Sequence, residues 1–335
     1  MIRRLVVLAS LVALISASCG GTDDGESGSI TVYSGRSEEL VAPVIDRFEE
    51  ASGISVEVRY ADSAELAATI LEEGSNSPAD VFFAQDPASL GAVALGGYFQ
   101  TLDATLLDRV DDRFSDGAGR WVGISGRVRV VVYDSEKIDP ATLPATEDGF
   151  TDPAWAGRLA VAPTNGSFLA FVAAKILIDG EAATLRWLEG IEANNSPTYP
   201  SNSVIVSAVD DGEVDAGLVN HYYLLRRQDE VGDTVAANHF MTGGGAGSLV
   251  MPAGAGILAG SDDAAAAAEF IDFLLGEEAQ TFFAEETFEY PLAGGVAASD
   301  ALPPLESLNP PRLTLSDLAG VLDRATDLVA TAGLL

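Results

Sequence analysis

Alternating strand and helix patterns begin at residue 30. Short β-branched and aromatic runs alternate with segments whose apolar side chains recur at helical spacing. The strand-like runs are residues 30–35, 54–60 and 79–85, and the helical segments are residues 37–53 and 63–74. Ser37 suits the start of the first helix and Gly53 its end, because serine accepts from free backbone N–H groups and glycine tolerates a left-handed backbone. This βαβαβ order predicts an open α/β sheet with ligand-binding loops after the strands.

A second set of strands and helices follows a long β-branched run. Strands are predicted at residues 157–163 and 214–220, and helices at residues 165–178, 182–194, 201–212, 262–286 and 314–335. Residues 120–134 and 243–258 have the composition of extended segments that cross between the two sets. We therefore predict an α/β fold of two discontinuous lobes that close on a ligand like a clamp. The first lobe is predicted over residues 30–126 and 248–302, and the second over residues 127–247 and 303–335.

The N-terminus has the features of a targeting segment. Two arginines precede the apolar run "LVVLASLVALI", which is too short to span a bilayer. We predict a signal peptide over residues 1–18, a lipidated Cys19, and a flexible Gly-rich tether over residues 19–29. The alternative is plain secretion, because "SAS" before Cys19 also fits a small-x-small cleavage site. Either outcome places the folded part outside the cytoplasmic membrane, in the periplasm or at the cell surface.

Composition narrows the classes of function. A chain of 335 residues exceeds one ordinary core, which agrees with two lobes. The net charge of −33 disfavours nucleic acid and anionic lipid as partners and attracts cations. The two histidines lie outside known metal motifs, and the only cysteine is at the N-terminus. No nucleophile elbow or P-loop is present, so an enzyme is disfavoured.

Two adjacent tyrosines, Tyr222 and Tyr223, follow the predicted strand at residues 214–220. Neighbouring helical residues point about 100° apart, so both rings cannot share one narrow core stripe. The polar Asn220 and His221 beside them argue against an apolar core position. Deprotonated phenols are hard oxygen ligands that match a hard, highly charged cation. The plainer interpretation is that one phenol packs in the core while the other bonds at the surface.

Six stretches give the chain a specific resemblance. They are "ITVYSGRSEELV", "LEEGSNSPADVFFAQD", "WVGISGRVRVVVYD", "APTNGSFLAFVAA", "NSVIVSAVDDGEVDAGLVNHYYL" and "EYPL". Together they resemble the ferric-ion-binding proteins of bacterial iron ABC transporters, which are family 1 extracellular solute-binding proteins. The resemblance implies a two-lobed periplasmic-binding-protein-like clamp of type II. It also implies that Tyr222 and Tyr223 supply phenolate oxygens to Fe³⁺.

The same resemblance implies an anion, carbonate or phosphate, next to the iron. The stretch "TNGS" matches a helix start that cradles this anion, and a helix N-terminus is a general anion site. The residues expected to bind the anion are Asn165, Gly166, Ser167, Asn202, Asn220, Arg127 and, more weakly, Arg36.

Two positions depart from the pattern of the family. Some members have a histidine ligand where this chain has Ser37 and a glutamate ligand where it has Gln85. Neither residue is an equivalent donor, so the ligand set of this chain is expected to differ. Asp86 is a further carboxylate next to Gln85, and Ser37, Gln85 and Asp86 remain possible ligand-site residues.

The leading hypothesis is a monomeric receptor that captures Fe³⁺ with an anion and hands it to an ABC transporter permease. The alternative keeps the clamp but assigns it a small organic or oxyanion solute. In that case the tyrosines would stack or hydrogen-bond instead of binding metal. An enzyme on the same fold is the least favoured interpretation, because no base and nucleophile pair was found.

Overall fold

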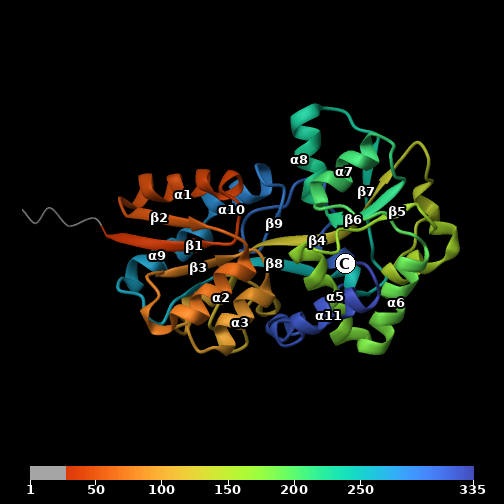
Figure 1. Cartoon of the computed structure of the whole chain (residues 1–335). Helices are drawn as coiled ribbons and strands as arrows, with labels where there is room; N and C mark the ends of the chain where they lie inside the picture. The colour runs from red at the N-terminus through yellow and green to blue at the C-terminus, as the bar shows by residue number, and fades with distance from the viewer. Residues whose placement is uncertain (1–27) are drawn as a thin grey trace, which may run out of the picture.

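The computed structural model describes residues 28–335 and has two α/β lobes side by side (Figure 1). The predicted signal peptide, Cys19 and most of the predicted tether lie outside the described residues. Ser29, assigned to the tether from the sequence, is already the first residue of a strand. In the part of the chain that the structure describes, no helix is long and apolar enough to cross a membrane.

The first lobe begins with the predicted βαβαβ unit. Strand β1 lies between β2 and β3 and is parallel to both. The elements are β1 Ser29–Ser34, α1 Glu38–Ser52, β2 Ser55–Tyr60, α2 Ser63–Glu73, β3 Val81–Ala84 and α3 Pro87–Leu95. Helix α1 ends where Gly53 adopts a left-handed conformation with φ 74°, as expected from its sequence. Every residue of β3 is buried, as a central strand requires.

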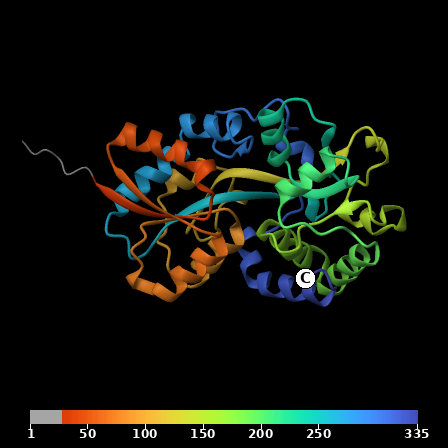
Figure 2. The same cartoon turned by 45° about the horizontal axis from the view of Figure 1, so that its top comes forward.

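Two long antiparallel strands connect the lobes. They are β4 Val122–Asp134 and β8 Val250–Ile257, and they run side by side through the centre of the molecule (Figure 2). The first half of β4 pairs with β8, and its second half pairs with strands of the second lobe. Gly254 lets the two backbones approach, because an added Cβ would lie 2.7 Å from the carbonyl oxygen of Val122. The predicted crossing segments are therefore confirmed.

The second lobe surrounds the far half of β4. Strand β6 is parallel to β5 and antiparallel to β4, and β7 also pairs with β4. The elements are β5 Leu159–Ala160, α5 Gly166–Asp179, α6 Glu181–Ala193, α7 Asn202–Asp210, β6 Ala216–Asn220, α8 Tyr222–Val231 and β7 Ala236–Phe240. The sequence analysis missed α8 and β7, as it missed α3. Helix α8 has a low apolar content, and only two of its side chains, Tyr222 and Leu224, are buried.

Two predicted helices are corrected. The single helix expected at residues 262–286 is divided into α9 Ala264–Leu274 and α10 Glu277–Glu285, because Gly276 has an extended backbone that interrupts the helix. The helix expected at residues 314–335 begins as a 3₁₀ helix, Leu315–Val321, before α11 Leu322–Thr331. The 3₁₀ helix contacts α3 of the first lobe and α5 of the second, and α11 packs on α5 and α6.

Candidate metal and anion site

The tyrosine pair lies where a buried strand turns directly into a helix. Strand β6 ends at Asn220, His221 is the N-cap residue, and α8 begins at Tyr222. Tyr222 is 1% exposed and Tyr223 is half-buried. Their rings stack with centroids 4.3 Å apart and planes 27° from parallel. The turn from strand to helix therefore brings two adjacent phenols into one stacked pair.

The surroundings of the two phenols are strongly basic. Arg36, Arg127 and Arg129 are all buried close enough to the tyrosines to interact with them electrostatically. Burial and the neighbouring phenol raise the pKa of Tyr222 well above its ordinary value, although Arg127 and Arg36 act against this rise. Within residues 28–335, no hydrogen bond is made by either phenol oxygen. Tyr222 is therefore protonated at neutral pH, and a cation would have to displace its proton.

Arg36 is held in a buried ion pair instead of lining the cleft. Its Nη2 donates to Glu289 Oε1 over 2.8 Å, and both side chains are at most 1% exposed. Ser125 donates to the other oxygen of Glu289. Burial alone would raise the pKa of Glu289, but Arg36 and Arg127 hold it below its usual range. Glu289 therefore supplies a negative charge beside Tyr222 and offsets part of the charge of the arginines.

Arg127 and Arg129 lie on the same face of β4, since they are two residues apart. Arg129 Nη1 donates to Ser167 Oγ over 2.9 Å and to Asn220 Oδ1 over 3.2 Å. Burial lowers the pKa of Arg129 to about 10 and also lowers that of Arg127. Nε and Nη1 of Arg127 have no hydrogen-bond partner among the described residues. A buried cation without an acceptor is costly, so this arrangement favours an anionic ligand.

The start of α5 is the place where the sequence predicts an anion cradle. Asn165 caps the helix by accepting from the backbone N–H of Ser167 over 3.1 Å. The side-chain amide of the fully buried Asn202 donates to Asn165 Oδ1 over 3.3 Å and to Ser167 Oγ over 3.2 Å. Gly166 has open space where a Cβ would point. The N–H groups of Ser167, Phe168 and Leu169 already donate to Asn165, so the cradle offers an anion the positive end of α5 and the guanidinium of Arg129.

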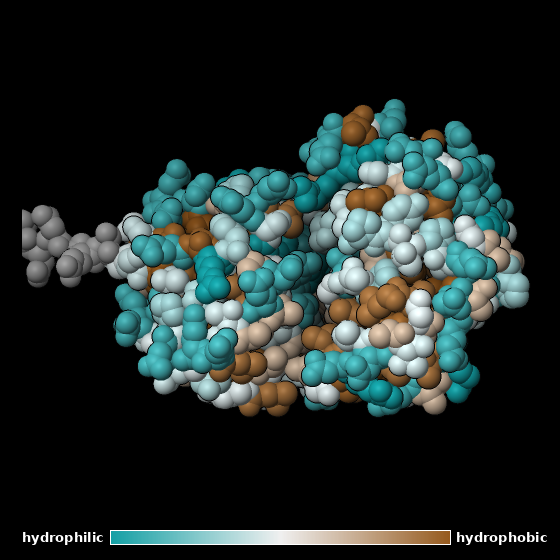
Figure 3. Space-filling model, in the orientation of Figure 1, coloured by the Kyte–Doolittle hydropathy of each residue, from teal (hydrophilic) through white to brown (hydrophobic). Residues whose placement is uncertain are grey.

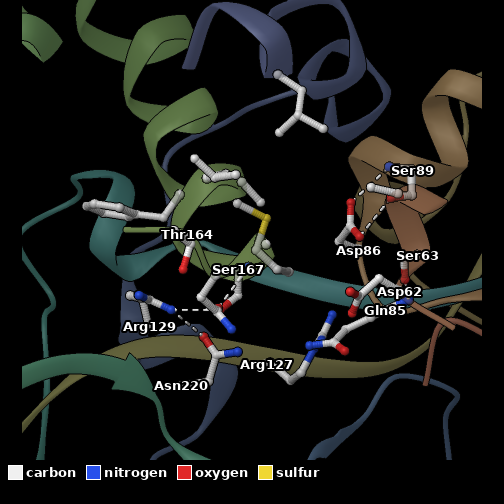
Figure 4. A pocket seen from close by; sticks show the side chains of 18 of the residues that line it. Asp62, Ser63, Gln85, Asp86, Ser89, Arg127, Arg129, Thr164, Ser167 and Asn220 are labelled. Carbon is white, nitrogen blue, oxygen red and sulfur yellow. Dashed lines mark hydrogen bonds between the residues drawn. The ribbon is translucent and has the colours of Figure 1, made fainter. Parts of the chain in front are cut away.

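The cradle opens into a cleft of about 390 Å³ between the lobes (Figure 4). Arg127, Arg129 and Asn220 line it, whereas the tyrosine pair and Arg36 are not among its lining residues. A groove between the lobes is also visible on the face shown in Figure 3, where the outer surface is mostly hydrophilic. Of the residues expected to bind the anion, the cleft is lined by Arg127, Asn165, Gly166, Ser167 and Asn220, but not by Asn202 or Arg36. The phenols lie close enough to Arg127 and Arg129 to interact with them electrostatically.

The side of the cleft formed by the first lobe includes Gln85, one of the two positions that depart from the family pattern. Gln85 and Asp86 line the cleft, but Ser37 is exposed at the start of α1 and does not. Both carboxylate oxygens of Asp86 accept hydrogen bonds from Ser89, one from its N–H over 2.8 Å and one from its hydroxyl over 2.9 Å. Asp86 is therefore used to cap α3 in this structure.

His221, at the start of α8, connects β4 to the segment that carries Glu289. Its Nδ1 accepts from the N–H of Val128 over 3.2 Å, and its Nε2 lies 2.8 Å from the carbonyl oxygen of Phe288. A carbonyl only accepts, so Nε2 carries the proton. Burial lowers the pKa of His221 to about 4, and the ring is neutral at pH 7. The histidine next to the tyrosines is thus a structural link between elements, with both nitrogens occupied.

His221 should make the stability of the protein fall in mild acid. Its pKa is about 4 when folded and about 6.5 when unfolded, so the unfolded chain binds the proton first as the pH falls. We expect its contribution to be complete above about pH 6.5 and to fall by about 2 kcal/mol at pH 5. Measuring the free energy of unfolding in urea at pH 7 and at pH 5 tests this expectation. The His221→Gln side chain keeps one donor and one acceptor, so this variant should lose about 2 kcal/mol less stability between the two pH values than the unsubstituted protein does. The control variant His239→Gln should lose as much stability as the unsubstituted protein. An unchanged loss in His221→Gln would contradict the assignment.

Sequence reasoning missed four residues of the site. They are Ser125, Arg129, His221 as a structural link, and Glu289. The alternation of a strand was the available signal for Arg129, because it predicts that Arg127 and Arg129 share a face. Glu289 lies in the quoted "EYPL" stretch, but nothing in that stretch indicates its pairing with Arg36.

Comparisons with known proteins identify the family of this chain. Residues 76–314 match the family model for bacterial extracellular solute-binding proteins. The major ferric iron-binding protein of Neisseria meningitidis serogroup B is 34% identical over 330 residues, covering 97% of this chain and 98% of the relative. The Fe(3+)-binding periplasmic protein of Serratia marcescens is 32% identical over 333 residues, covering 98% of this chain and 96% of the relative.

Solved structures show the same fold. Iron-bound HitA from Pseudomonas aeruginosa has a TM-score of 0.86 and 34% identity, covering 91% of this chain and 99% of HitA. A Trichodesmium protein in complex with iron and citrate ligands has a TM-score of 0.80 and 27% identity, with coverage of 91% and 99%. From the family match and the near full-length relatives, we conclude that this chain belongs to the bacterial extracellular solute-binding proteins.

Proposed function

We propose that this protein captures ferric iron together with an anion between its lobes and delivers the iron to an ABC transporter permease. The observation that carries the proposal is the stacked pair of Tyr222 and Tyr223, whose phenols have no hydrogen-bond partner among residues 28–335. Phenolates are hard ligands for a trivalent cation, and direct coordination to the ion favours phenolate over phenol. The function is binding, and the protein is not an enzyme.

The anion site supports the same proposal. A carbonate or phosphate at the start of α5 would accept from the N–H of Gly166 and from Arg129, which already donates to Ser167 and Asn220. The anion would also complete the charge balance of a site that has three buried arginines. Carbonate and phosphate are the two anions that the family resemblance implies.

The names of the relatives support iron as the cargo. Two of them are described as ferric or Fe(3+)-binding proteins, and the Serratia protein is described as periplasmic. Delivery to a permease follows from the usual role of an extracellular solute-binding protein. The proposed location is outside the cytoplasmic membrane, with lipidation of Cys19 as the proposed anchor.

Iron affinity should fall steeply as the pH falls. Burial raises the pKa of Tyr222, so binding of the metal displaces a proton from it. Each proton that the metal displaces predicts a loss of about 10-fold in apparent affinity per pH unit below neutrality, and two phenolate ligands therefore predict about 100-fold. Competition against a ferric chelator of known pH dependence measures this slope. A slope close to zero would exclude phenolate ligation.

The second candidate function is binding of a small organic or oxyanion solute without metal. The observation that favours it is the wall of the first lobe, where Gln85 offers an amide in place of a carboxylate and Ser37 lies outside the cleft. Thermal stabilisation by such a solute in the absence of iron, together with no effect of ferric ion, would select this candidate.

A further inference from the structure

One residue of the crossing strand β4 has no partner in β8. Gly123 faces Gly254 across the ladder and Ser125 faces Ala253, so Ile124 between them is an extra residue, a β-bulge. A bulge shifts the pairing by one position, and side chains alternate between the two faces of a strand. The bulge therefore decides which residues of β4 point toward the site.

The shift places Arg127 in the cleft. Arg127 lies opposite Met251 in the ladder, and both residues line the cleft. Without the extra residue, Gly126 would take that place. Ser125 and Arg129 share the face of Arg127, because each is two residues away from it along the strand. One inserted residue thus accounts for the direction in which three polar side chains of β4 point.

The buried amide of Gln280, on α10, holds the bulge in place. Its Nε2 donates to the carbonyl oxygen of Ile124 over 3.0 Å and to that of Leu274 over 2.7 Å. Its Oε1 accepts from the N–H groups of Leu292 and Ala293 over 2.9 and 3.1 Å. Gln280 is fully buried, and both its donors and both its acceptor positions are used. A buried carbonyl at an extra strand residue needs such a partner, because no water reaches it.

The same amide fixes the segment that carries Glu289. Strand β9 (Tyr290–Pro291) pairs with β4 directly after the bulge, at Ser125 and Gly126. Glu289 precedes β9 and accepts from the hydroxyl of Ser125, while the residues that follow β9 donate to Gln280. Gln280 is not among the residues that line the cleft. Any effect that it has on binding must therefore pass through the residues that it holds.

We propose that Gln280 is a positioning residue of the binding site and acts by holding the bulge at Ile124. The bulge in turn directs Ser125, Arg127 and Arg129 toward the tyrosine pair and the anion cradle. The inference rests on the proposed function and adds to it a residue outside the cleft lining. It also gives a role to a fully buried glutamine among the apolar side chains of α10.

Gln280→Met tests the inference, because methionine has a similar length but cannot donate to Ile124. We expect ferric affinity, measured by competition against a ferric chelator, to fall by about 10- to 100-fold, the range for residues that orient metal ligands without binding the metal. The gain in ferric affinity on adding bicarbonate or phosphate should also shrink, since Arg127 would no longer be held toward the anion. Both quantities are measured at a temperature at which circular dichroism shows the variant to be folded.

Asn194→Leu is the matched control. Asn194 is also a buried amide that donates to two carbonyl oxygens, those of Phe150 and Asp152, but it lies at the end of α6 and does not line the cleft. Both substitutions should lower the free energy of unfolding in urea. Asn194→Leu should nevertheless leave ferric affinity and its dependence on the anion unchanged. Equal losses of affinity in the two variants would reveal a general effect of stability and would refute the positioning role.

The remaining outcomes separate this inference from the proposed function. Full ferric affinity in folded Gln280→Met would overturn the inference alone. If Gln280→Met does not fold, Gln280→Glu takes its place, since a carboxylate keeps the acceptors for Leu292 and Ala293 but lacks the donors to Ile124. Failure of both variants to fold, while Asn194→Leu folds, would show that Gln280 serves the whole fold and would also contradict a role in the site. Absence of ferric binding in the unsubstituted protein would overturn both proposals.

Discussion

Tyr222→Phe and Tyr223→Phe are each expected to lower ferric affinity by more than about 100-fold, the upper end of the loss seen for residues that only support a metal ligand. Each substitution removes one charged oxygen but keeps the aromatic ring. The stack with centroids 4.3 Å apart is therefore preserved, and stability should change little. Competition against a ferric chelator measures the affinity, and urea unfolding measures the stability.

Tyr98→Phe is the matched control, because Tyr98 is a half-buried phenol outside the cleft lining. It should leave the affinity unchanged. Full ferric affinity in either variant of the pair would show that its phenol is not a ligand. Loss of affinity together with loss of folding would instead indicate a packing role.

Glu289→Gln is expected to destabilise the protein by about 3–5 kcal/mol, the cost of removing one partner from a buried ion pair. Arg36 would be left as an uncompensated charge, since it and Glu289 are at most 1% exposed and 2.8 Å apart. Denaturant unfolding at neutral pH measures the change. Because Glu289 also offsets the charge beside Tyr222, the added positive potential should lower the affinity for Fe³⁺ in any variant that folds.

Glu286→Gln provides the comparison for this effect. Glu286 also pairs with an arginine, Arg47, over 2.6 Å, but the two side chains are 48% and 35% exposed. Exposed ion pairs contribute at most about 1 kcal/mol, so this variant should remain close to the unsubstituted protein in stability. Equal effects of the two substitutions would mean that burial does not make the Arg36–Glu289 pair important.

Local sequence patterns were sufficient to predict much of the fold. Alternating strand and helix periodicity identified β1 to β3 of the first lobe and both crossing strands, because each element buries a recognisable face. The break between α9 and α10 was not visible in that pattern. It depends on the backbone of one residue, Gly276, inside a segment that is otherwise favourable for a helix.

The site was predictable where its residues are close in sequence. Asn165 and Ser167 form their cap contacts within one helix turn, and the tyrosines are adjacent at a strand end. Partners that are far apart in sequence left no local signal. Arg36 and Glu289 are 253 residues apart, and they meet because β9 Tyr290–Pro291, which follows Glu289, pairs with β4 at the centre of the molecule. The sequence alone therefore suggested Arg36 as a weaker anion-binding residue and gave no sign of its ion pair with Glu289.

The central claim is that two adjacent phenolates bind ferric iron in this protein. The visible absorption spectrum of the purified, iron-stripped protein after addition of ferric ion with citrate, bicarbonate or phosphate tests it most directly. The account predicts a tyrosinate-to-iron charge-transfer band with at least one anion, weakened in both Tyr222→Phe and Tyr223→Phe. The absence of such a band with every anion would contradict the account and would direct attention to a metal-free solute.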